Sequence, residues 1–120
     1  MRTLTRTFPF FLLFALLTSF APEPTTLTKG RIEVIFNRKT ELNDLAKIKL
    51  DLAKKGIVLD YRKIEFDKYG DLISLYFTVD CKDGFSGSAE SASLTNQSKF
   101  GFYRDYSKGV VSPFGVGNLE

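Results

Sequence analysis

One amphipathic helix, set between stretches of alternating residues, most constrains the fold of this chain. TELNDLAKIKLDLAKKG (40–56) has apolar residues at helical spacing. The expected apolar stripe comprises Leu42, Leu45, Ala46, Leu52 and Ala53, with Ile48 at its margin. Thr40 is expected to cap the N-terminus, and Gly56 suits the left-handed conformation that ends many helices. A helix with one apolar face buries that face, so we expect it to cover a sheet.

The flanking segments predict the strands of that sheet. RIEVIF (31–36) alternates before the helix, and LISLYFTVDC (72–81) alternates after it. In IVLDYRKIEFD (57–67) the alternation changes phase between Tyr61 and Ile64, which one extra residue in a β-bulge would explain. The sequence DKYG then predicts a turn, so the last two segments are expected to form a hairpin.

Past Cys81 the strand signal weakens. KDGFSGSAESASLTNQS (82–98) is compatible with a loop, a ragged edge strand or a helical turn, whereas SKFGFYRDY (98–106) is typical of an extended segment. The elements follow a β-α-β-β-β order and predict an α+β fold, with one antiparallel-rich sheet of four to five strands and the helix on one face. We expect this domain to span 31–107, and the glycine-rich residues 108–120 to form a flexible tail.

The N-terminus has the features of an export signal. Two arginines precede an apolar run (8–20) that ends near small residues. We expect residues 1–21 to be a cleaved signal peptide, because a membrane span needs about 20 apolar residues, and 22–30 to be a linker. The protein is therefore expected to be bacterial, and periplasmic or secreted. Pro22 disfavours cleavage, so a retained leader that tethers the domain to a membrane is the alternative.

The charge balance argues against nucleic acid as a partner. The chain has 17 Lys and Arg against 14 Asp and Glu, and without the two leader arginines the balance is 15 against 14. A mature protein so close to neutral has no long-range attraction for nucleic acid or anionic lipid. A membrane is therefore a partner only if the leader is retained.

Catalytic and metal sites find no support in the residue content. The chain has no histidine, so Ser86 in DGFSGS (83–88) lacks the base that a serine nucleophile normally needs, and we interpret the segment as a turn. Cys81 is the single cysteine, so it forms no internal disulfide and no usual zinc set. Its place in the alternation predicts a buried position. We expect no enzymatic activity, no cofactor and no metal.

Residues from about 31 to 88 resemble a known module. The features are a helix ending in KKGIVL, a strand leading into D-x-x-G, a long second hairpin strand, and VDCKDGFSGS. Together they resemble the small module at the C-terminus of bacterial transmembrane metallopeptidases of the beta-lactam-sensor kind, and short stand-alone exported proteins. The resemblance implies an α+β domain outside the membrane, of poorly understood function. The H-E-x-x-H zinc helix of those peptidases is missing, so their chemistry is not implied.

These observations predict a binding or regulatory domain. The expected partner is a protein or peptide, bound by strand addition at an exposed sheet edge within residues 85–106. The candidate contact residues are Tyr103, Tyr106, Ser86 and Ser88. Tyrosine suits an interface because its ring can be buried against a partner while its hydroxyl stays in contact with water. The two serines lie in the segment after Cys81, where the strand signal is weak. The alternative is an inhibitor or accessory subunit of an extracytoplasmic peptidase, with residues 82–90 entering its cleft.

Overall fold

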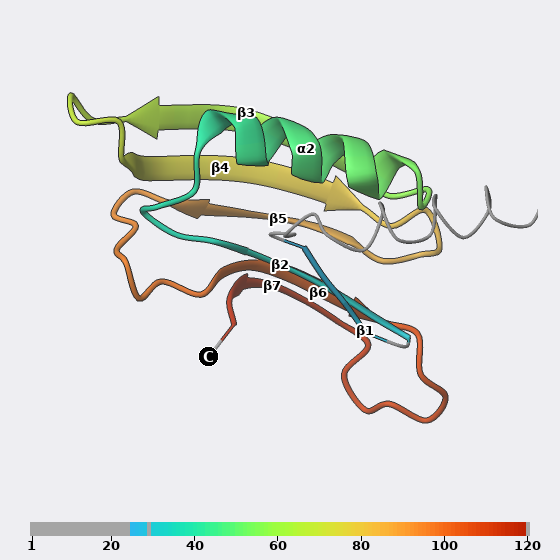
Figure 1. The fold of residues 1–120 in the computed structure, drawn as a ribbon. Helices are drawn as coiled ribbons and strands as arrows, with labels where there is room; N and C mark the ends of the chain where they lie inside the picture. Colours follow the sequence, from blue (N-terminus) through green and yellow to red (C-terminus); the bar gives the residue numbers. More distant parts are fainter. Residues whose placement is uncertain (1–24, 29, 120) are drawn as a thin grey trace, which may run out of the picture.

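The protein is an α+β fold with two antiparallel sheets and one helix in the part of the chain that the structure describes (Figure 1). This computed structural model describes residues 25–28 and 30–119, so the predicted signal peptide lies outside the described residues. Sheet A has the strand order β1-β2-β6-β7, and sheet B has the order β3-β4-β5. The elements are β1 Thr25–Thr28, β2 Arg31–Phe36, α2 Leu42–Ala53, β3 Val58–Phe66, β4 Leu72–Asp80, β5 Ser86–Ser91, β6 Phe100–Asp105 and β7 Phe114–Asn118.

The predicted class and helix are confirmed, but the single sheet and the β-α-β-β-β order are wrong. β2 pairs with β6, not with the hairpin that follows the helix, so β2 and β3 belong to different sheets. Two further strands lie in segments for which the sequence predicts none. β1 lies in the expected linker, and β7 lies in the expected tail, where it pairs with β6. The uncertain segment after Cys81 contains strand β5.

The core lies between two layers. Phe77 of β4 contacts Phe36 of β2, with ring centroids 5.5 Å apart, and Phe100 of β6, with centroids 5.4 Å apart. Helix α2 lies against β3, where the Tyr61 hydroxyl donates a hydrogen bond to the Leu45 carbonyl (2.7 Å). Sheet B therefore forms one layer, and sheet A with α2 forms the other (Figure 1).

Helix α2 differs from its prediction at its N-terminus. Its N-cap is Glu41, which forms a reciprocal capping box with Asp44. The Thr40 hydroxyl accepts a hydrogen bond from the Asn37 N–H (3.0 Å) and is not the cap. At the other end Gly56 has φ +82°, and the Ile57 N–H donates to the Leu52 carbonyl (3.0 Å), which confirms the left-handed glycine stop.

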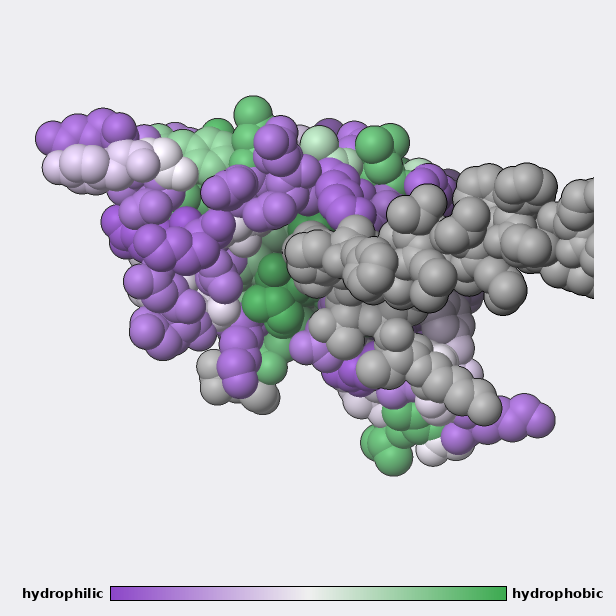
Figure 2. Space-filling model, in the orientation of Figure 1, coloured by the Kyte–Doolittle hydropathy of each residue, from purple (hydrophilic) through white to green (hydrophobic). Residues whose placement is uncertain are grey.

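The buried stripe of α2 is rotated from the expected one. Leu45, Ile48 and Leu52 are buried, whereas Leu42 and the two expected alanines, Ala46 and Ala53, are exposed. Ile48 therefore lies at the centre of the stripe and not at its margin. The face of the molecule that carries α2 is mostly hydrophilic, with separate hydrophobic spots (Figure 2).

The β-bulge predicted in the hairpin is confirmed. Tyr61 pairs with Phe77 and Lys63 pairs with Tyr76, so Arg62 is the extra residue of β3. A second register shift lies near the DKYG turn, where Gly70 has φ +86°. Within the described residues no helix is long and apolar enough to span a membrane.

Candidate functional site

Strand β5 lies at the edge of sheet B. It pairs with β4 from Asp80↔Ser86 to Leu75↔Ser91, and no other strand of the described residues pairs with it. The Cys81 N–H donates to the Phe85 carbonyl (2.9 Å), which sets the alternation of hydrogen-bonded pairs along the ladder. The backbone groups of the two odd-numbered residues that follow, 87 and 89, therefore face β4. The backbone groups of Ser86, Ser88 and Glu90 point away from the sheet.

Strand β7 is the edge of sheet A beside β5, and among the residues that the structure describes it pairs with β6 alone. Its ladder with β6 is bounded by hydrogen bonds from Asp105 N–H to the Pro113 carbonyl (2.7 Å) and from Leu119 N–H to the Lys99 carbonyl (2.8 Å). The same alternation points the backbone groups of residues 114, 116 and 118 away from β6. Because β5 packs over β7, both edges lie on one side of the molecule, which we call the open side.

The core reaches solvent at the open side. Four hydrophobic residues there are only partly buried: Phe85, Ala89, Phe114 and Val116. The rings of Phe85 and Phe114 contact each other across the two layers, with centroids 5.8 Å apart. A Cβ added to Gly87 would lie 3.0 Å from Val116, so the small residues of β5 allow the layers to approach closely. Apolar surface and unpaired backbone therefore occur together at this side.

A concavity of about 520 Å³ lies on the outer face of sheet B beside the β5 edge. Its lining includes Val58, Asp60, Thr78, Asp80, Lys82, Ser86 and Ser88. Both candidate serines therefore contribute to a polar hollow next to the free edge. Neither has a histidine or another base positioned against it by any hydrogen bond of the described residues.

Arg104 fixes the turn that leads into β5. Its guanidinium donates to the Asp83 carboxylate through Nε (3.0 Å) and Nη2 (2.8 Å), although the arginine is only 9% exposed. It also donates to the Asp105 carbonyl (2.6 Å). The guanidinium carbon lies 4.4 Å from the Phe85 ring centroid and 4.3 Å from that of Tyr106. The turn before β5 is thus tied to β6 through Asp83 and Phe85, and the interpretation of all of DGFSGS as a turn is wrong for Ser86 to Ser88, which begin β5.

The structure confirms that Cys81 is buried. Burial raises the pKa of its thiol to about 11, and the nearby Asp83 carboxylate adds to this effect. Cys81 is 6% exposed and belongs to the hydrophobic core cluster, as its place in the alternation predicts.

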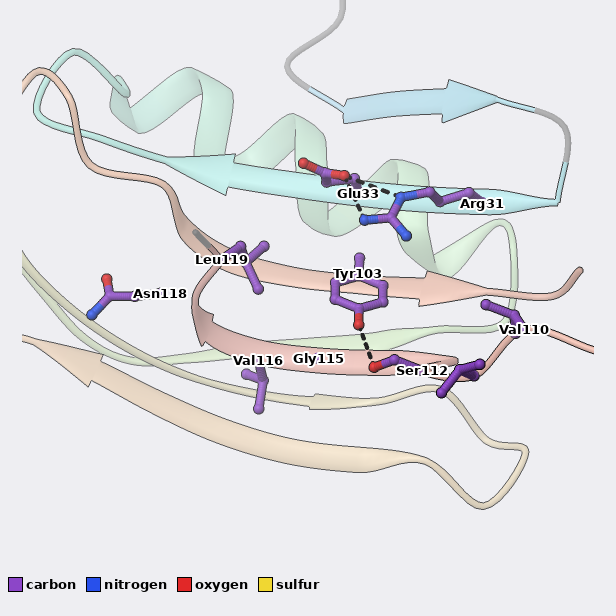
Figure 3. Close-up of a pocket in the computed structure, with 10 residues that line it drawn as sticks. Arg31, Glu33, Tyr103, Val110, Ser112, Gly115, Val116, Asn118 and Leu119 are labelled. Carbon is purple, nitrogen blue, oxygen red and sulfur yellow. Dashed lines mark hydrogen bonds and ion pairs between the residues drawn. The ribbon is translucent and has the colours of Figure 1, made fainter.

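Tyr103 lines a different hollow from the two serines, together with Arg31, Glu33 and Ser112 (Figure 3). It projects from β6 on the outer face of sheet A, where its ring covers Gly115 and the Arg31 guanidinium lies 4.1 Å from the ring centroid. Its hydroxyl shares a hydrogen bond with the Ser112 hydroxyl (2.7 Å). Arg31 is itself paired with Glu33 (2.9 Å), so these groups largely satisfy one another.

Tyr106 follows β6 and is 45% exposed, with Arg104 against its ring. The four candidate residues are therefore not brought together in one site. The expectation of a free edge within 85–106 holds only for β5, because β6 is paired on both sides by β2 and β7. Arg104 is not among the site residues predicted from the sequence. Its signal in the sequence is its position, because a charged residue follows Phe100 and Phe102 at the next inward-facing position of the strand.

The described residues hold no group of three or more metal-ligating side chains that could bind a metal ion. No family model matches the chain, and comparisons with curated proteins and with solved structures find no match. The resemblance to the metallopeptidase-associated module stays a prediction.

Proposed function

We propose that this chain is an exported, non-enzymatic binding protein that accepts an extended segment of a partner protein or peptide along β5. The observation that carries the proposal is the open side, where unpaired backbone groups of Ser86, Ser88 and Glu90 lie next to partly exposed core residues. Main-chain hydrogen bonds to a sheet edge supply affinity in strand addition, and adjacent hollows receive alternate side chains of the added segment. The concavity beside β5 suits the second role.

The composition of β5 favours pairing with an added strand, because β5 lacks most of the features that prevent such pairing at other sheet edges. Natural edge strands are commonly guarded by lysine, proline, bulges or inward charges. β3, at the other edge of sheet B, carries Arg62, Lys63 and Glu65 together with a bulge. β5 is SGSAES, with small side chains, no proline and one charged residue. An incoming strand therefore meets little steric or electrostatic opposition at β5.

Export is the part of the proposal supported by the leader sequence, with its arginines and apolar run. The test is the intact mass after expression with the native leader in a bacterial host, measured separately in membrane and soluble exported fractions. A soluble species shorter by about 21 residues is the expected result. A full-length membrane-bound species would instead favour the tethered alternative.

Strand addition is tested with peptides selected from a displayed random library against dilute, immobilised protein. We expect selected peptides to protect the amides of Ser86, Ser88 and Glu90 from hydrogen exchange. Ser88→Pro removes an outward N–H that is not used within sheet B, and should weaken peptide binding by about tenfold. Ser88→Ala keeps that N–H and is the matched control. Protection elsewhere, or equal binding by the two variants, would contradict strand addition at β5.

The inhibitor alternative is less well supported by the geometry. Most of residues 82–90 belong to β5 or to a turn whose Asp83 and Phe85 side chains contact Arg104. Lys82 is the residue of that turn whose side chain is most available to a protease cleft, at 62% exposed. Inhibition of an extracellular protease that disappears in Lys82→Ala would favour this alternative.

A further inference from the structure

We propose that the partner of β5 is β5 of a second copy of this chain, paired antiparallel about a two-fold axis at Ser88. The inference rests on the proposed function of the β5 edge and names its occupant. Pairing of this kind would join the two copies of sheet B into one continuous sheet across the dimer. It would also remove the unguarded edge from solvent, which is a recurrent requirement for stable β-proteins.

The register follows from the positions of the outward backbone groups. These groups belong to Ser86, Ser88 and Glu90, evenly spaced along the strand. A two-fold axis at Ser88 places each Ser88 opposite its own counterpart, and each Ser86 opposite Glu90 of the second copy. Every outward N–H and C=O of the strand then meets a complementary group. Shifting the axis to residue 87 or 89 leaves part of this set unpaired.

Charge placement agrees with the same register. Glu90 is the one charged residue of β5, and like charges directly opposite each other destabilise a sheet. The axis at Ser88 keeps the two glutamates apart, each facing a serine. It also brings Glu90 to the end of the strand that leads into the turn of the second copy, where the Lys82 side chain is 62% exposed. Asp80 also lies beside Ser86 there and pairs with Lys82 (3.7 Å), so the advantage of this register is that the two glutamates do not face each other.

The second layer adds apolar contact. β7 lies beneath β5, and its Phe114 and Val116 are only partly buried at the open side. Two copies related by the axis would bring these side chains toward each other below the joined sheet. A two-fold interface uses the same patch on both copies, so one arrangement covers the partly exposed residues of both copies. Backbone pairing and apolar burial therefore favour the same partner.

The first test is the molar mass in solution, measured by light scattering or sedimentation across a wide range of protein concentration. We expect wild-type protein and Ser88→Ala to pass from monomer to dimer as concentration rises. Ser88→Pro removes the two hydrogen bonds at the axis, so its dimer dissociation constant should rise by about tenfold or more. Its circular dichroism spectrum shows whether the fold is kept, because the lost N–H is not used within the monomer.

The second test fixes the register by disulfide trapping. Hydrogen-bonded pairs in antiparallel sheets have Cα atoms about 5.5 Å apart, within disulfide range. Ser88→Cys should therefore form a cross-linked dimer under mild oxidation. Ser86→Cys should not, because the two positions 86 would lie about 14 Å apart, four residues along the strands. The combination Ser86→Cys with Glu90→Cys should cross-link, and wild-type protein with its buried Cys81 serves as the control.

The outcomes separate this inference from the proposed function. A protein that stays monomeric at all concentrations, yet binds selected peptides along β5, overturns the self-pairing and keeps strand addition. A dimer that persists in Ser88→Pro and resists trapping through Ser88→Cys places the interface elsewhere and also overturns the self-pairing. A monomer that binds no peptide at β5 overturns both proposals. Trapping at position 88 but not at position 86 supports both.

Discussion

Arg104 is the residue on which the geometry of the open side depends. It is a charged group placed in the inward alternation of β6, and its cost of burial is offset by the Asp83 carboxylate, a backbone carbonyl and two aromatic rings. A buried charge that loses its partner is strongly destabilising. The contacts of Arg104 with Asp83 and Phe85 therefore fix the position of the turn before β5. Because β5 begins directly after this turn, they also fix the position of the β5 edge.

Replacing Asp83 with asparagine should lower the free energy of unfolding by about 2 kcal/mol, since the hydrogen bonds from Arg104 lose a charged acceptor. Urea titration followed by circular dichroism measures the change. Asp80→Asn is the matched control, because the Asp80 carboxylate is half exposed and pairs with Lys82 across 3.7 Å. We expect its effect to stay below about 0.5 kcal/mol. Equal effects for the two variants would mean that Arg104 does not depend on Asp83.

Acid should destabilise the protein partly through Asp67. Backbone N–H groups of Asp71 (3.0 Å) and Tyr69 (2.9 Å) donate to its carboxylate, and these bonds, together with the nearby Arg38, lower its pKa. A carboxylate whose folded pKa lies below its unfolded value, about 3.9, stabilises the fold above that value. The stabilisation is lost as pH falls through the folded pKa. Asp67→Asn should flatten the decline in unfolding free energy below about pH 4, and parallel declines would contradict this.

Helix α2 shows what its sequence predicts and what it leaves open. The spacing of apolar residues, the acidic first turn and Gly56 predict its existence and its end. They do not identify the buried face, because Leu42, Ala46 and Leu50 form a second apolar row beside the one that contains Ile48. Packing against β3 decides between the rows, and that contact is not visible in a single segment of sequence.

Substitutions in the two rows should differ sharply in their effect on the free energy of unfolding. Ile48→Ala should lower the free energy of unfolding by about 3 kcal/mol, because this side chain is 0% exposed and its removal leaves a cavity. Leu50→Ala, two residues away, should change it by less than about 0.5 kcal/mol, because Leu50 is 65% exposed. Thermal or urea unfolding of the two variants measures both. A large loss for Leu50→Ala would show that its row is covered in the folded protein.

Local patterns predict the hairpin better than the pairing of β2 with β6. The bulge at Arg62 follows from a change of phase within eleven residues, whereas β2 and β6 are separated by the helix, the hairpin and β5. One signal was present in the sequence at Gly101. A Cβ at this position would lie 1.8 Å from the Val34 carbonyl oxygen, so the FGF of β6 allows a close approach of two backbones that only glycine permits.

At the scale of the molecule, the described residues form two layers, and the free edges of β5 and β7 lie together at the open side. The sequence predicts the class because the helix and the alternating strands are strong signals. It does not predict two sheets, because β1 and β7 are short and lie in segments whose threonine, proline and glycine content is typical of linkers and tails. The site is therefore only half predicted. Ser86 and Ser88 lie at the free edge, while Tyr103 lies on the outer face of sheet A and Tyr106 beyond the end of β6.

Strand addition requires that the β5 edge is free in the monomer and available to a partner. Hydrogen exchange of single amides, measured by NMR on dilute protein, shows whether it is. We expect rapid exchange for Ser86, Ser88 and Glu90, and slow exchange for Gly87 and Ala89, whose N–H groups face β4. Uniformly slow exchange along β5 in the monomer would show that the edge is already covered, and would contradict strand addition at this site.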